Sequence, residues 1–161
     1  MCNIAQIYGI FLKAKESDYL CIATSKRKKN MTNEDKVSKA VELKKSGAYN
    51  CAQSVACAFR TEAGVDHETM AAMTSAYGLG MGNMHGTCGA LIGAGAVIGL
   101  VERDRNRARI AIKDVMEKFE QRNGATICRD LKGIESGKML RSCNDCVADA
   151  AEFTQQYLSR K

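Results

Sequence analysis

Proline and tryptophan are absent from this sequence of 161 residues. Alanine and methionine are plentiful, and apolar residues recur at helical spacing between the turn signals. Because proline is the residue least compatible with a helix interior and alanine the most compatible, this composition favours an all-helical fold. The length fits a single domain that buries a core of its own.

Long apolar runs are also missing, since no segment approaches the roughly 18 to 20 apolar residues that span a membrane. The first residues, MCNIAQIYGIFLK, lack the basic start and the small-residue cleavage site of a secretory signal peptide. We therefore expect a cytoplasmic protein without a membrane span, in which the eight cysteines stay reduced. Clustered cysteines in that compartment indicate metal or redox chemistry more often than structural disulfides.

The net charge of +6 raises the question of nucleic-acid binding. Six Lys and Arg residues against two acidic residues give the first thirty positions a charge of +4, and the rest of the chain carries only +2. The excess comes largely from Lys26, Arg27, Lys28 and Lys29. No aromatic platform or binding motif accompanies this run, so it is more typical of a solvated linker or tail, and we expect no nucleic-acid partner.

The composition changes at Met31. Residues 1–30 hold β-branched and aromatic segments that are compatible with two short strands or with disorder. From residue 31 the pattern is helical: Thr32 and Asp35 resemble a capping box, and Gly47 marks a helix end. We therefore expect an N-terminal appendage outside the core over residues 1–30 and a helical, cysteine-bearing domain over residues 31–161.

This domain is predicted to be a compact bundle of about five to six helices. The expected helices cover 32–47 and 50–63, begin after Asp66 and at Cys88, cover 104–123, and begin after Ser142. Thr87 is the expected N-cap of the helix that starts at Cys88, and Ser142 with Asp145 resembles a capping box. A glycine-rich loop, GLGMGNMHGT, separates the third helix from the fourth.

Glycines occur at high density on both sides of Cys88. The loop before it has four in nine residues, and the segment TCGALIGAGAVIGL has four more within a helical pattern. Each glycine in a helix interior costs about 1 kcal/mol relative to alanine, so the close approach of another group has to offset that cost. Gly95 and Gly99 are most simply explained by tight helix packing, whereas Gly89 and Gly93 leave room beside Cys88. The residues expected to line a bound group are Gly82, Gly86, Gly89, Gly93 and His85.

Cys51, Cys57 and Cys88 can each be placed on a predicted helix. On a helical wheel Cys51 lies on the apolar face of its helix and Cys57 on the polar face. Cys88 stands in the first turn of a helix, where the macrodipole and free N–H groups stabilise a thiolate and lower the pKa. A small buried cysteine is the plain alternative for Cys88.

Cys143 and Cys146 form a CxxC motif at a helix start, with both thiols on the inward face. A thioredoxin-like site needs a βαβ context and a zinc ribbon needs a second CxxC, and this chain has neither. No histidine follows Cys146, which excludes c-type haem attachment. The interpretation that remains is a site assembled from distant segments.

The two histidines carry weaker signals. His67, at a helix start, is expected to be solvated. His85, in the glycine-rich loop beside Cys88, is either another solvated residue or a thiol partner or fourth ligand. Neither has a partner in the sequence that indicates hydrolytic chemistry.

The motifs NCAQSV, GLGMGNMHGTCGALIGAGAVIGL, FEQRNGATICRDL and CNDCVADAAEF, in this order, resemble the redox-active proteins labelled C_GCAxxG_C_C. The resemblance covers residues 31–161, and residues 1–30 have no counterpart in it. The label writes Gly-Cys-Ala, whereas this chain reads Cys88-Gly89-Ala90, so we take Cys-Gly-Ala-x-x-Gly as the motif. The resemblance implies a helical fold and a gene position near transporter genes. It also implies four characteristic cysteines: Cys51, Cys88, Cys128 and one of the closing pair, for which Cys143 is preferred over Cys146.

Three functions are compatible with this set. The first is a thiol redox protein of the oxidoreductase type, in which Cys88 attacks and a disulfide cycles among Cys51, Cys88, Cys128, Cys143 and Cys146. The second is an electron-transfer protein in which Cys51, Cys88, Cys128 and Cys143 bind an iron–sulfur cluster or zinc. The third is a helical interaction module with structural cysteines.

The first two functions call for a redox or electron-transfer protein partner, and the sequence is also compatible with a homo-oligomer. Both require that the cysteines converge on one pocket although they are far apart in sequence. Cys57 is expected to stand apart, and Cys2 and Cys21 to lie in the appendage.

Overall fold

The structure, a computed structural model, describes residues 35–161. This part of the chain folds into α-helices and one short 3-10 helix, and its β-structure is limited to a single bridge between Thr87 and Ile127. The helices are α2 (Lys36–Lys45), α3 (Cys51–Ala58), α4 (Arg60–Ala63), α5 (His67–Thr74), the 3-10 helix η1 (Ser75–Tyr77), α6 (Gly89–Glu102), α7 (Arg105–Asn123), α8 (Cys128–Lys132) and α9 (Cys143–Ser159). The predicted all-α fold is confirmed, and the predictions for residues 1–30 lie outside the described residues.

Two short helices raise the count above the predicted five to six. The expected helix over 50–63 is interrupted at Phe59, whose backbone caps α3 and precedes α4, and Gly64 ends α4 in a left-handed conformation as the sequence indicates. The other addition is α8, a short helix that begins at Cys128. Its five residues are too few to produce a periodic sequence pattern.

Side-chain caps fix most of the long helices where the sequence predicts them. Asn50 and Gln53 form a reciprocal capping box on α3, and Asp66, Asp104 and Ser142 accept backbone N–H groups at the starts of α5, α7 and α9. Each such cap satisfies a donor that the first helical turn leaves unpaired.

Two predicted helix starts are wrong. The N-cap of α2 is Asp35, whose carboxylate accepts the N–H of Val37, and Thr32 lies outside the described residues. Thr87 does not cap α6, because it is held in the bridge to Ile127 and Cys88 itself is the N-cap. Cys88 therefore stands one position before the first turn rather than within it.

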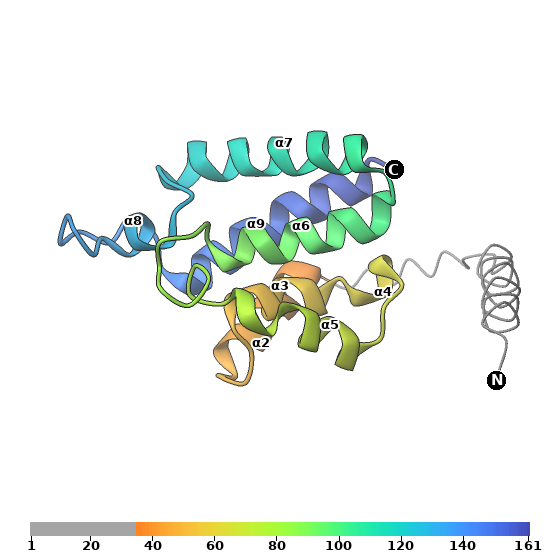
Figure 1. Cartoon of the computed structure of the whole chain (residues 1–161), viewed down its shortest axis with the longest axis horizontal. Helices are drawn as coiled ribbons and strands as arrows, with labels where there is room; N and C mark the ends of the chain where they lie inside the picture. Colours follow the sequence, from red (N-terminus) through yellow and green to blue (C-terminus); the bar gives the residue numbers. More distant parts are fainter. Residues whose placement is uncertain (1–34) are drawn as a thin grey trace, which may run out of the picture. The chain divides into compact units, whose positions relative to one another are not determined.

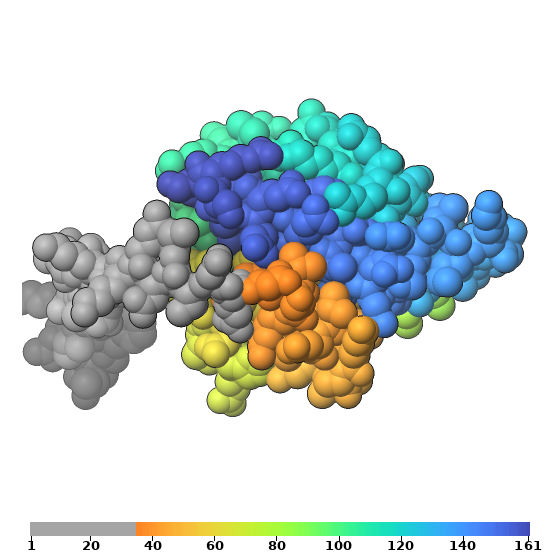
Figure 2. Space-filling view, turned by 180° about the vertical axis from the view of Figure 1, so that it is seen from behind, coloured from red at the N-terminus to blue at the C-terminus, as the bar shows by residue number. Residues whose placement is uncertain are grey.

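The helices pack in three layers (Figure 1). The central layer is formed by α6 and α9, α7 covers one side, and α2, α3 and α5 cover the other. From behind, α9 is seen lying between α2 and α7 (Figure 2). The side chains that are buried between these layers include Phe59, Met70, Leu91, Ile98, Val115, Phe119 and Val147. No helix of the described residues is long and apolar enough to cross a membrane.

A buried charge anchors the segment that enters α9. The carboxylate of Asp149 is 5% exposed and accepts hydrogen bonds from Arg141, which precedes the helix, and from Arg122 on α7. Arg122 also pairs with Glu152 and lies 4.3 Å above the ring of Phe153. These contacts fix the first turn of α9, which carries both cysteines of the CxxC motif.

Candidate functional site: a cluster of five thiols

Cys88 and Cys146 are the centre of the cluster. Both are buried, and the thiol of Cys146 donates a hydrogen bond to the sulfur of Cys88. This bond, assisted by the N–H groups of Ala90 and Leu91, lowers the pKa of Cys88 to about 7 although burial opposes the shift. The same bond, together with burial, raises the pKa of Cys146. Cys88 is therefore half ionised near neutral pH, while Cys146 keeps its proton.

Cys51 reaches the cluster from the first turn of α3. A Cβ atom on Gly89 would lie 2.6 Å from the sulfur of Cys51 and 2.4 Å from the carbonyl oxygen of Tyr77, so only glycine fits at that position. The space that the sequence predicts beside Cys88 is thus occupied by a second thiol. Burial raises the pKa of Cys51, and the N–H of Leu79 partly offsets that effect.

Cys128 is brought to Cys88 by backbone hydrogen bonds. Its N–H donates to the carbonyl of Gly86 at 3.0 Å, and the N–H of Cys88 donates to the carbonyl of Thr126 at 2.8 Å. These bonds flank the bridge between Thr87 and Ile127, so the two cysteine segments lie side by side. Burial and the neighbouring thiols raise the pKa of Cys128 to about 11.

Cys143 is the most exposed member of the cluster and the first residue of α9. The side chain of Lys132, at the end of α8, hydrogen-bonds the sulfur of Cys143, and this bond raises the pKa of Lys132. The positive charge of Lys132 also acts on Cys88, where it adds to the lowering of the pKa, and on Cys128, where it only partly offsets the raised pKa. One lysine therefore supplies positive potential to several thiols at once.

The glycine-rich loop holds the cluster through an unusual backbone. The residues Leu79, Gly80, Met81 and Gly82 are consecutive and all have φ between 54° and 85°, and the N–H of Gly82 donates to the carbonyl of Gly78 at 2.9 Å. Left-handed turns cost about 1–2 kcal/mol per non-glycine residue, so a run of them needs support from its surroundings. That support comes from the thiols: the N–H of Leu79 faces Cys51, and a Cβ on Gly80 would lie 2.6 Å from the Cβ of Cys128.

Cys57 and the two histidines lie elsewhere. Cys57 was expected on a polar face, but it is buried and only 4% exposed, because α3 packs against α2, α5, α6 and α9 and has little free surface left. The charged group that acts on its thiol is Arg60, not a cysteine of the cluster. His67 is exposed as expected, yet it has a partner that the sequence did not indicate, the hydroxyl of Tyr49 at 2.8 Å. His85 is exposed, and its backbone N–H donates to the side chain of Asn83.

The remaining glycines have different reasons for their positions. Gly82 has nothing within 4 Å of an added Cβ and is explained by its φ of 85°, while a Cβ on Gly86 would lie 3.1 Å from the carbonyl oxygen of Gly80. The tight packing predicted for Gly95 and Gly99 is wrong. A Cβ on Gly95 would make ordinary contact with Ile112, and one on Gly99 would meet nothing within 4 Å.

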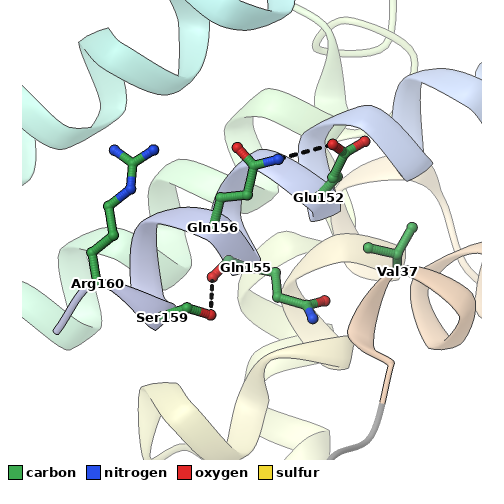
Figure 3. Close-up of a pocket in the computed structure, with 6 residues that line it drawn as sticks. All are labelled: Val37, Glu152, Gln155, Gln156, Ser159 and Arg160. Carbon is green, nitrogen blue, oxygen red and sulfur yellow. Dashed lines mark hydrogen bonds between the residues drawn. The ribbon is translucent and has the colours of Figure 1, made fainter.

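Two surface grooves lie away from the thiols. A groove of about 380 Å³ between α2 and the second half of α9 is lined by Val37, Glu152, Gln155, Gln156, Ser159 and Arg160 (Figure 3). A second groove of about 540 Å³ runs along α6 and α7, where Leu91, Gly95 and Ile112 contribute to its wall. Since no cysteine lines either groove, neither presents a small molecule to the thiols.

A metal ion makes specific demands on the positions of its ligands. Structural zinc takes four ligands at 2.0 to 2.3 Å, which requires the donor atoms to surround one point. Over residues 35–161 no group of three His, Cys, Asp or Glu side chains is placed to hold an ion in this way. All six cysteines in this range are free thiols.

Lys132 and Gly80 are site residues that sequence reasoning missed. Lys132 follows Cys128 by four positions, which is one helical turn, but the helix between them is too short to be visible in the pattern. Gly80 was noted as a loop glycine, and its contact with Cys128 depends on how the loop folds back.

Comparison with known proteins supports the chemical interpretation. No curated protein and no solved structure matches the chain. A family model described as "Putative redox-active protein (C_GCAxxG_C_C)" matches residues 49–157, a range that contains all five thiols of the cluster. The chain therefore belongs to this C_GCAxxG_C_C family of proteins described as redox-active.

Proposed function

We propose that this protein is a thiol redox protein whose Cys88 and Cys146 cycle between a dithiol and a disulfide. The observation that carries the proposal is the hydrogen bond from the Cys146 thiol to the Cys88 sulfur, which joins a cysteine of low pKa to one that keeps its proton. An attacking thiolate with a pKa near the ambient pH combines ionisation with nucleophilicity. The free state of the cysteines fits a reducing compartment, and we place the reaction in the cytoplasm.

The reaction transfers two electrons. The Cys88 thiolate and the Cys146 thiol lose one proton in total and both electrons when the sulfur–sulfur bond forms. A disulfide acceptor takes up those electrons, and its own bond breaks to give two thiols. Reduction by a dithiol donor reverses the same steps.

The other thiols support this pair rather than replace it. Burial raises the pKa of Cys51 and of Cys128, which keeps both protonated near neutral pH. Their proximity excludes water from one side of Cys88 without adding a second thiolate. The positive charge of Lys132 favours the ionised form of Cys88.

The test is a redox titration of protein purified without oxygen. The protein is equilibrated with mixtures of reduced and oxidised dithiothreitol, quenched with acid, alkylated and mapped by mass spectrometry. We expect one disulfide, between Cys88 and Cys146, and we expect Cys88→Ser to abolish it. Cys57→Ser is the matched control, because Cys57 is equally buried but lies outside the cluster.

The same sample distinguishes thiol cycling from binding of an iron–sulfur cluster or zinc. Iron and acid-labile sulfide, or zinc, are measured on it before any oxidant is added. Stoichiometric metal that is lost in Cys88→Ser, or the absence of a Cys88–Cys146 disulfide at every potential, would overturn the proposal.

A further inference from the structure

We propose that Cys143, held beside Lys132 at the edge of the cluster, is the thiol that exchanges with the disulfide of a polypeptide partner and passes the disulfide inward to Cys146 and Cys88. This inference rests on the proposed redox function. It concerns how a buried pair communicates with an external substrate.

Cys88 and Cys146 are both buried, so an external disulfide has to react first with another thiol. Cys88 is 5% exposed and Cys146 is 3% exposed, so neither sulfur is open to a substrate. Cys143 is the cysteine of the cluster that is not buried. It also precedes Cys146 by three positions on α9, a spacing that places two side chains on the same helix face.

Cys143 has the surroundings of a reactive thiol. The side chain of Lys132 contacts its sulfur, and it occupies the first helical position after the Ser142 cap. A cation and a helix start both stabilise a thiolate relative to a thiol. Lys132 is therefore a positioning residue for the sulfur of Cys143.

Exposed apolar side chains surround this edge of the molecule. Of the seven large hydrophobic residues that are exposed within residues 35–161, five lie in two loops, the glycine-rich loop and the loop between α8 and α9. We call these five the apolar rim: Leu79, Met81, Ile134, Met139 and Leu140. Both loops lie at the same end of the helical unit (Figure 1).

Hydrogen bonds through α8 tie the two loops of the rim together. The N–H of Arg129 donates to the carbonyl of Met84 at 2.9 Å, and the N–H of Leu140 donates to the carbonyl of Leu131 at 2.9 Å. Leu79 and Met81 both lie in the left-handed turn of the glycine-rich loop. A rim spread over two loops fits a polypeptide, because a small disulfide would contact only the residues next to Cys143.

The exchange balances in three steps. Cys143 gives up its proton and attacks one sulfur of the partner's disulfide, that bond breaks, and a mixed disulfide forms while the released partner thiolate takes up a proton. Cys146 then loses its proton and attacks the sulfur of Cys143, which releases the second partner thiol and leaves a Cys143–Cys146 disulfide. Finally the Cys88 thiolate attacks Cys146, which forms the Cys88–Cys146 disulfide and frees Cys143.

The test uses the full chain in its reduced form and two probes. One is a synthetic peptide with a single disulfide between cysteines flanked by leucines, and the other is hydroxyethyl disulfide. We expect Cys143→Ser to slow the reaction with the peptide at least tenfold, while diamide still produces the Cys88–Cys146 disulfide in that variant. With Cys146→Ser, we expect the peptide to stay attached to Cys143 as a mixed disulfide that mass spectrometry locates.

The rim is tested with Met139→Glu combined with Leu140→Glu. Relative to the parent, we expect this double variant to lose about tenfold more of its reaction rate with the peptide than with hydroxyethyl disulfide. Ile110→Glu, at an exposed position of α7, should change neither rate. Lys132→Gln should slow both probes, and Lys132→Arg should restore the rate. Circular dichroism confirms that each variant is folded.

Three outcomes would overturn the inference. These are an unchanged peptide rate in Cys143→Ser, a mixed disulfide located on Cys88 in Cys146→Ser, and an equal loss with both probes in the double rim variant. Each leaves the Cys88–Cys146 disulfide, and so the proposed function, intact. Failure of the proposed function is recognised separately, because diamide would then produce no Cys88–Cys146 disulfide in the unmodified chain.

Discussion

Gly93 on α6 lies directly against the backbone of Ala52 on α3. A Cβ atom at Gly93 would stand 2.4 Å from the carbonyl oxygen of Ala52, a distance that no side chain can accept. Together with the contact between Gly89 and Cys51 one turn earlier, this close approach sets the distance between the two helices and therefore the depth at which the thiol of Cys51 enters the cluster.

Gly93→Ala should destabilise the protein by about 1–3 kcal/mol, because the added methyl group meets backbone that cannot turn aside. Gly99→Ala is the matched control in the same helix, where an added Cβ meets nothing within 4 Å. It should stabilise the fold by about 0.5–1 kcal/mol through helix propensity. Urea unfolding measures both, and equal effects of the two substitutions would contradict the packing described above.

The ionisation of Cys88 can be followed by the absorbance of thiolate at 240 nm. We expect one thiolate to form with a midpoint of about pH 7 in the reduced protein. Cys146→Ala removes the hydrogen bond that contributes most to this low pKa, so the midpoint should move upward. Cys57→Ala should leave the midpoint unchanged, and a midpoint that is insensitive to Cys146→Ala would show that this bond does not set the pKa.

Asp149→Asn should destabilise the protein by about 1–3 kcal/mol, because a buried carboxylate that accepts from Arg122 and Arg141 is replaced by a neutral amide. Glu117→Gln is the control, since Glu117 pairs with Lys113 on the exposed side of α7. That pair should contribute no more than about 0.5 kcal/mol. Thermal unfolding of the two variants distinguishes the buried pair from the surface pair.

The environment of Glu102 predicts that the free energy of unfolding decreases at acid pH. Contacts with Lys161 and with the hydroxyl of Tyr157 lower the pKa of Glu102 below its ordinary value. A carboxyl whose pKa is lower in the folded state stabilises the fold above its unfolded pKa of about 4.3, and that contribution is lost as the pH falls through the folded pKa. Unfolding experiments should therefore show Glu102→Gln less stable than the parent at pH 6 and closer to it at pH 3. A constant difference across this range would refute the assignment.

Removal of residues 1–34 should leave cooperative unfolding intact. The buried side chains described above, and all five thiols of the cluster, belong to the unit Asp35–Lys161. Calorimetry of the shortened chain measures the transition. Loss of cooperativity would show that the first residues contribute to the core after all.

Local signals in the sequence determined the helices, because helix caps depend on residues that are neighbours in the chain. Asn50, Asp66, Asp104 and Ser142 each satisfy an N–H group three positions away, so their helices could be located without knowledge of the fold. The cysteines of interest were also visible, since a CxxC motif and a glycine-flanked cysteine are local patterns. The resemblance to the C_GCAxxG_C_C family indicated which of these cysteines form one set.

Tertiary structure alone decided which groups meet. The bond between Cys146 and Cys88, the lysine beside Cys143 and the sulfur of Cys51 against Gly89 join residues on different helices, and nothing in their spacing specifies those contacts. Tertiary packing also overruled the helical wheel at Cys57, because α3 is surrounded by α2, α5, α6 and α9 and its polar-looking face is buried as well. A wheel describes one helix in isolation, whereas burial and pKa depend on every element that packs against it.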